Sequence, residues 1–335
     1  MNLPHITGIT LPRYKSSIMN QSKLTGRDLF AALGVVLIWG SNFVAMKFAL
    51  HDFTPMQLGA ARYVFAILPL IIVIRRPKMH WKWIVLYGLS QGVGQFGLLF
   101  IALQIGMTAA LASVLMQTQM FFTALFGFAF LHERPNRALQ IGLALAALGL
   151  TCFAMNYLLP SGTSHTGTTA LGFVLSLGAA SLWALSNIVV RRAQQATPQF
   201  EVLPFMVWSS LIPILPFIGL TLLIDAPATR WHWLAAPWYG WVSIAYLGWI
   251  ATIFAYTLWT GLLKRHPANR VAPFSLGVPV IGLVAGMTVL GEAVTAWQWV
   301  GVALVVMALA SVLFGGRWGA TKLSQPATNG SPQSR

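Results

Sequence analysis

The sequence is poor in charged residues, which excludes an ordinary soluble domain. Only 8% of its 335 residues are Asp, Glu, Lys or Arg, whereas 57% are hydrophobic. A soluble domain carries charge on roughly a quarter of its residues. Cysteine is scarcer still, because Cys152 stands alone in an apolar run. The chain therefore has neither an internal disulfide nor a cysteine pair for a metal, and its composition suits a lipid bilayer.

The signatures of enzymes and of ATP-driven pumps are also missing. No GxxxxGK[ST] phosphate loop occurs, so the chain itself is not predicted to hydrolyse ATP. His132 and Glu133 lack the second histidine of a zinc-binding HExxH motif. We therefore predict no cofactor, no metal and no enzymatic activity. The six acidic residues fall at the ends of apolar runs or between them, which weakens the case for proton coupling through a buried carboxylate but leaves it open.

Apolar runs of membrane-spanning length follow one another along the chain. A helix that crosses a bilayer needs about 20 residues, and the Gly and Ala residues in these runs let such helices pack closely. The predicted fold class is an all-α integral membrane protein with ten transmembrane helices. The spans are expected at 29–50, 55–74, 83–104, 107–131, 138–157, 168–190, 202–224, 238–262, 268–290 and 294–315.

The basic residues predict the orientation of these spans. A net charge of +15 would suit nucleic acid only if the basic residues gathered on one soluble face or tail, and here they lie in short loops between apolar runs. With the N-terminus inside, every basic residue except Lys47, Arg62 and Arg230 lies on the cytoplasmic side. Such a bias is how membrane topology is encoded. We predict a lipid bilayer as partner and no nucleic acid.

Both ends of the chain are predicted to be cytoplasmic tails. Residues 1–27 lack the apolar core and the cleavage site of a signal peptide, and Met19 is an alternative start to Met1. Residues 317–335 are polar and rich in Gly, Ser, Pro and Asn, a composition typical of a disordered tail.

The two halves of the chain resemble each other. A tryptophan shortly before a Ser-Asn pair occurs in the first span, at Trp39 and Asn42, and again in the sixth, at Trp183 and Asn187. Each half has five spans, an odd number, so the second half must lie upside down relative to the first. Inverted repeats are a recurring plan of secondary transporters. The repeats are predicted at 28–157 and 168–316.

Several segments of the chain resemble the EamA family of the drug/metabolite transporter superfamily. They are WGSNFVAMKFAL (39–50), GAARYVFAILP (59–69), LASVLMQTQMFFTALFGFAFLHERPNRALQIG (111–142), and VAPFSLGVPVIGL (271–283) followed by LGEAVTAWQWVG (290–301). The resemblance covers about residues 27–318. It implies ten helices in two inverted five-helix repeats around a central substrate cavity.

The resemblance also implies a secondary exporter in the bacterial inner membrane. The expected substrate is a small amino acid or amino-acid-derived metabolite, similar to cysteine or O-acetylserine, moved by alternating access. Export of another small metabolite or drug on the same fold is the alternative. A membrane enzyme would need a convergent acid, base or metal cluster, and a non-transporting sensor is the third hypothesis. The sequence predicts no oligomeric state.

Arg62 is the most informative single residue for the binding site. It lies about two turns inside the second span, where a charge is costly and points to function. A guanidinium presents a planar fork that suits a carboxylate, so we predict that Arg62 binds a substrate carboxylate. The alternative is a cation that only joins helices.

Polar and aromatic residues inside other spans complete the predicted site. Buried amides need partners, and they suit a zwitterionic solute that offers both donors and acceptors. They could equally join helices. Gln117 and Gln119 share a helix face poorly, so at most one is expected to face the pathway. The predicted substrate-binding residues are Arg62, Trp39, Asn42, Gln95, Gln117, Trp183, Asn187 and Tyr256.

Overall fold

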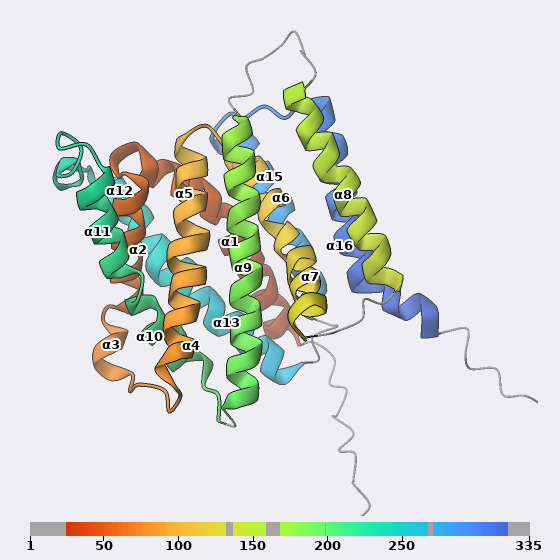
Figure 1. Cartoon of the computed structure of the whole chain (residues 1–335), viewed down its shortest axis with the longest axis horizontal. Coiled ribbons are helices and arrows are strands. Elements are labelled where there is room, and N and C mark those ends of the chain that lie inside the picture. The colour runs from red at the N-terminus through yellow and green to blue at the C-terminus, as the bar shows by residue number, and fades with distance from the viewer. Residues whose placement is uncertain (1–24, 132–136, 159–167, 198, 267–270, 321–335) are drawn as a thin grey trace, which may run out of the picture.

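The computed structural model describes residues 25–131, 137–158, 168–197, 199–266 and 271–320 (Figure 1). Nearly all of the predicted N-terminal tail, the segment with His132 and Glu133, and residues 321–335 lie outside this part of the chain. Within the described residues every regular element is a helix.

The first helix shows how the sequence begins an element. Thr25 caps α1, because its hydroxyl accepts the backbone N–H of Asp28 at 3.2 Å while the Asp28 carboxylate accepts the Thr25 backbone N–H at 3.1 Å. Such a reciprocal capping box satisfies two backbone donors that the helix cannot. The elements from the first predicted half are α1 (Gly26–Asp52), α2 (Pro55–Ile67), α3 (Leu70–Val73), α4 (Trp81–Tyr87), η1 (Gly88–Phe96), α5 (Gly97–Gln104), α6 (Ala109–Leu115), η2 (Met116–Thr118), α7 (Gln119–Leu131) and α8 (Arg137–Leu158).

In the rest of the chain, proline divides one long apolar run. Proline lacks a backbone N–H and cannot continue a helix without loss, and Pro213 separates α10 from α11. The last helix, α16, extends beyond the predicted end of its span to Ala320. The elements are α9 (Ala170–Ala196), α10 (Val202–Leu211), α11 (Ile214–Ile224), η3 (His232–Ala235), α12 (Trp238–Ala245), η4 (Tyr246–Phe254), α13 (Ala255–Arg265), η5 (Ala272–Leu276), α15 (Gly277–Val289) and α16 (Ala296–Ala320).

Across the described ranges, seven stretches of helix are long and apolar enough to cross a membrane, and two shorter apolar helices add to them. The spanning stretches are Gly26–Asp52, Trp81–Gln104, Ala109–Phe130, Arg137–Met155, Ala170–Ala196, Val202–Ile224 and Trp238–Leu262. The predicted second span is absent from this set, because α2 ends at Ile67, just before Pro69.

Glycines set the closest helix contacts. Helices α8 and α16 stand side by side at one edge of the bundle (Figure 1). A Cβ added at Gly149 would lie 3.0 Å from the carbonyl oxygen of Gly301, and one added at Gly40 would lie 2.5 Å from the side chain of Ile281. Small residues permit this approach of backbones, which stabilises helix pairs in lipid.

Two of the described elements, η1 and η4, are π-helices of nine residues each. Their backbone hydrogen bonds skip one residue more than those of an α-helix, a geometry that is rare and frequent at functional sites. Both contribute side chains around Arg62, which lies on α2.

Candidate functional site

A cavity of about 330 Å³ lies among α1, α2, η1, α7, α9 and α13. All eight residues predicted from the sequence to bind substrate line it: Trp39, Asn42, Arg62, Gln95, Gln117, Trp183, Asn187 and Tyr256. The structure thus brings together residues that are separated by up to 217 positions in the chain. Whether they bind substrate stays a prediction.

Arg62 is buried, with 2% of its surface exposed. Its Nε and Nη2 atoms donate to the hydroxyl of Thr252 at 3.3 and 3.1 Å, and its guanidinium carbon lies 3.9 Å from the centre of the Phe96 ring. Its Nη1 atom is buried without a hydrogen-bond partner. Among the described residues, none that lines the cavity is acidic.

A guanidinium in these surroundings lacks a counter-ion. Burying a charge is costly unless it is paired and hydrogen-bonded, and one threonine hydroxyl with one aromatic ring supplies little of that compensation. The geometry therefore leaves one donor of Arg62 available for an anionic group.

Two amide oxygens in the same cavity are also unpartnered. Asn42 Oδ1 and Gln95 Oε1 are buried and accept no hydrogen bond, and their residues are 8% and 3% exposed. Because most buried polar atoms are bonded, unbonded acceptors beside a cavity suit a ligand that carries donors.

The second asparagine of the repeated pattern is bonded within the protein. The Asn187 Nδ2 atom donates to Gln119 Oε1 at 2.8 Å and to the hydroxyl of Thr123 at 3.2 Å. Asn187 therefore joins α9 to α7, whereas Asn42 keeps its acceptor free. Residues that match by position in the two halves thus have different surroundings.

Aromatic rings form one wall of the cavity. The ring of Trp39 lies 5.0 Å from that of Tyr256 and 5.6 Å from that of Trp259, measured between ring centres. The Trp39 Nε1–H donates to the carbonyl oxygen of Ala251 at 3.1 Å, which fixes the ring.

Both Gln117 and Gln119 line the cavity, whereas their spacing in a regular helix predicts that at most one of them faces the pathway. The chain passes through a short 3₁₀ turn, η2, between α6 and α7. A 3₁₀ turn has three residues instead of 3.6, which changes the direction of neighbouring side chains. The Gln117 side chain then donates to the Ser275 carbonyl oxygen at 3.1 Å.

Thr252 and Phe96 touch Arg62 directly, and no pattern in the sequence indicates them. A threonine and a phenylalanine are common in membrane helices, so residue type gave no signal. The available signal was indirect: a deeply buried arginine needs an oxygen and an aromatic face nearby.

Polar contacts tie the helices together at both ends of α1. Near its start, the Asp28 carboxylate lies 2.9 Å from Arg265 Nη2 and 2.9 Å from His266 Nε2, at the end of α13. Toward the other end, the Lys47 ammonium donates to the carbonyl oxygen of Leu103 at 2.8 Å, which joins α1 to α5. The Glu292 carboxylate accepts the backbone N–H groups of Ala109 and Ala110 at 2.7 and 2.8 Å and so caps α6.

Comparison with known proteins adds family and fold. The family model described as "EamA-like transporter family" matches residues 27–155 and 170–314. A Salmonella typhimurium protein described as "Probable amino-acid metabolite efflux pump" is 38% identical over 295 residues, which cover 88% of this chain and 97% of that protein. An Escherichia coli protein of the same description is 36% identical over 296 residues, with coverage of 88% and 97%.

A solved structure described only as "Crystal structure of protein" aligns with a TM-score of 0.56 at 18% identity, covering 89% of this chain and 99% of that one. This likeness supports the fold alone. The family match covers most of the chain, so the chain belongs to the EamA-like transporter family. It is a multi-pass membrane transporter.

Proposed function

We propose that this member of the EamA-like transporter family exports an amino acid or an amino-acid-derived metabolite across the bacterial inner membrane. The observation that carries the proposal is the buried Arg62, with a free Nη1 donor and no acidic residue lining the cavity around it. A substrate carboxylate supplies the missing anion in the planar geometry that a guanidinium prefers.

The unpartnered oxygens of Asn42 and Gln95 complete recognition of a zwitterion. An ammonium group carries three donors and no acceptor, so it suits these two amide oxygens, while Trp39 and Tyr256 contact the side chain of the substrate. The relatives from Salmonella and Escherichia are described as pumps for amino-acid metabolites, and cysteine or O-acetylserine fits this chemistry.

For the membrane arrangement, the proposal is ten spans in two inverted five-helix halves, 28–157 and 168–316, with both termini cytoplasmic. The family model matches the chain in two segments of similar length. The π-helices η1 and η4 also occupy corresponding places, in the third predicted span of each half. Alternating access between such halves would expose Arg62 to one side of the membrane at a time.

The test is uptake into proteoliposomes that contain purified protein, with and without a pH gradient. Cysteine and O-acetylserine should be transported, and ethanolamine and acetate, each of which lacks one of the two charged groups, should not. Proton movement that depends on substrate would establish coupling. Transport of unrelated drugs in preference to every amino acid would overturn the proposed substrate class, and absence of transport of any solute would overturn the proposed function.

A further inference from the structure

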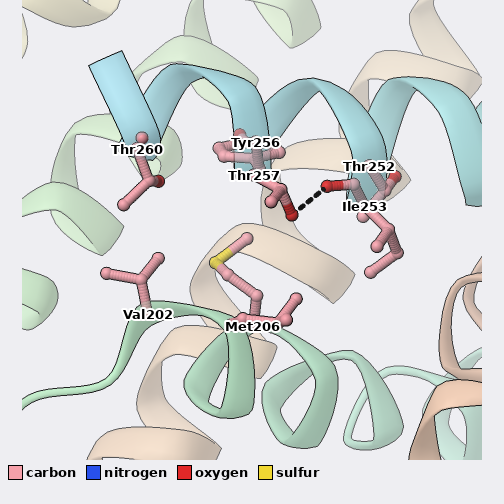
Figure 2. A pocket seen from close by; sticks show the side chains of 9 residues that line it. Val202, Met206, Thr252, Ile253, Tyr256, Thr257 and Thr260 are labelled. Carbon is pink, nitrogen blue, oxygen red and sulfur yellow. Dashed lines mark hydrogen bonds between the residues drawn. The ribbon is translucent and has the colours of Figure 1, made fainter. Parts of the chain in front are cut away.

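A groove of about 190 Å³ runs between α10 and α13, apart from the central cavity (Figure 2). Val202, the first residue of α10, lies at one end of it in Figure 2, on the same side as Thr260 of α13, and Gly261 next to Thr260 also lines the groove. Thr252 lies at the other end. At 1.5 Å per residue, the nine residues from Gly261 to Thr252 span roughly 13 Å, so the groove leads from the helix ends into the bundle.

A small chamber of about 20 Å³ lies between the groove and the central cavity and shares lining residues with both. Tyr256 lines all three spaces. Met206 and Thr252 line the groove and the small chamber, and Arg62 and Phe96 line the small chamber and the central cavity. A continuous series of lining residues therefore leads from the helix ends to Arg62. The small chamber is the narrow point of this series, and Tyr256 and Met206 both line it.

The side chains along the groove suit a solute without net charge. Hydroxyl groups of Thr252, Tyr256 and Thr260 recur every four residues, a spacing that places them on one side of the helix. The Thr257 hydroxyl is directed back to the carbonyl oxygen of Ile253 at 2.8 Å, drawn as the dashed line in Figure 2. In the described part of the chain, no charged residue lines the groove, whereas an ion in transit would need one.

One of the two residues at the narrow point, Met206, has a flexible side chain. Methionine is unbranched and flexible, so it adapts to the space around it, and Met206 faces the groove in Figure 2. The Tyr256 ring packs against Trp39, and the guanidinium of Arg62 donates to the hydroxyl of Thr252.

We propose that the groove between α10 and α13 is an access passage for substrate, and that Tyr256 and Met206 form the gate between this passage and Arg62. This inference rests on the proposed function. The solute is a zwitterionic amino acid with a small uncharged side chain. Because Arg62 lines the small chamber as well as the central cavity, a carboxylate passes the gate while remaining within reach of the same guanidinium.

The single cysteine of the chain permits a direct test by thiol labelling. In a Cys152→Ser background, Thr260→Cys places a thiol in the groove, and Leu223→Cys provides a matched control on α11, where Leu223 is 81% exposed and lines none of these spaces. Each protein is treated with methyl methanethiosulfonate, which adds a small group, or with pyrene maleimide, which adds a large one. Transport of O-acetylserine, which carries no thiol, is then measured in proteoliposomes.

The passage predicts that pyrene at position 260 lowers the initial rate at least tenfold, that the small group lowers it less than twofold, and that pyrene at position 223 has no effect. O-acetylserine should also slow the labelling of position 260 and not of position 223. Transport by the pyrene-labelled 260 protein at the rate of the labelled control refutes the passage while leaving the proposed function intact. Loss of transport in every preparation, including the unlabelled wild type, refutes the proposed function and, with it, the substrate named for the passage.

A second variant tests the gate without labelling. Met206→Trp fills the narrow point, so transport of O-acetylserine should slow at least tenfold while its Kd in detergent stays within threefold of the wild-type value. Transport at the wild-type rate by a correctly folded Met206→Trp protein would refute the gate.

Discussion

Replacement of Arg62 by methionine removes the guanidinium and keeps a flexible apolar stem beside Phe96. If Arg62 Nη1 donates to the substrate carboxylate, the variant loses one charge-assisted hydrogen bond, worth about 1.5–3 kcal/mol. Each 1.4 kcal/mol is a factor of ten in affinity. The Kd for O-acetylserine should therefore rise roughly 10- to 150-fold.

The assay is calorimetric titration of purified protein in detergent with two ligands, O-acetylserine and O-acetylethanolamine, which differ only in the carboxylate. The wild-type protein should bind the first more tightly than the second, and Arg62→Met should bind both equally weakly. The two proteins and the two ligands form a double-mutant cycle, which isolates the coupling between the guanidinium and the carboxylate.

Arg192→Met is the matched control, because Arg192 is an exposed arginine that donates to the carbonyl oxygen of Phe130 at 2.9 Å, away from the cavity. The Arg192→Met protein should bind O-acetylserine with the wild-type affinity. A folded Arg62→Met protein that binds O-acetylserine within threefold of the wild-type Kd would refute the assigned role. So would an equal loss of affinity for both ligands.

Three further predictions concern recognition and stability. Asn42→Ala removes a free acceptor and should raise the Kd for O-acetylserine about tenfold. The Kd for the N-acetylated form should stay unchanged, because that form lacks the ammonium group. A titration in which the affinity for both ligands falls equally would contradict this. Glu292→Ala uncaps α6 and should lower the free energy of unfolding by about 0.5–2 kcal/mol, measured by denaturation in detergent against Glu201→Ala, whose side chain makes no capping bond. Gly286→Ala places a Cβ 2.5 Å from Glu292 Oε2 and 2.8 Å from the Ala110 nitrogen, so the same measurement should show a loss of about 1–3 kcal/mol. Gly219→Ala, with nothing within 4 Å of the added Cβ, should show none, and equal stabilities of these two variants would refute the packing argument.

Much of the candidate site was predictable, because a polar side chain inside an apolar run is conspicuous. Arg62, Asn42 and Gln95 each interrupt a hydrophobic stretch, and all three line the central cavity. Their partners were less predictable. Thr252 becomes important only through its position opposite Arg62, which depends on how α2 packs against η4.

The local geometry of the helices was the other part that the sequence did not reveal. Periodicity assumes 3.6 residues per turn, so it misjudged Gln117 and Gln119 beside the 3₁₀ turn η2. The break after Ile67 was also missed, although Pro69 marks it, because the apolar run continues on both sides. Hydrophobicity predicts which segments enter the membrane, whereas packing and proline decide where each helix stops.

The π-helix η1 has a consequence for how this protein varies and how it is engineered. A π-helical turn behaves as an α-helix that has accepted one extra residue, and one residue corresponds to a rotation of about 100° around an α-helix. Removing a single residue between Gly88 and Gln91 would restore an ordinary helix and turn everything on one side of the deletion relative to the other. Gln95 and Phe96 would then no longer share the surroundings of Arg62. The spacing along this segment is therefore as much a part of the candidate site as the side chains that it carries.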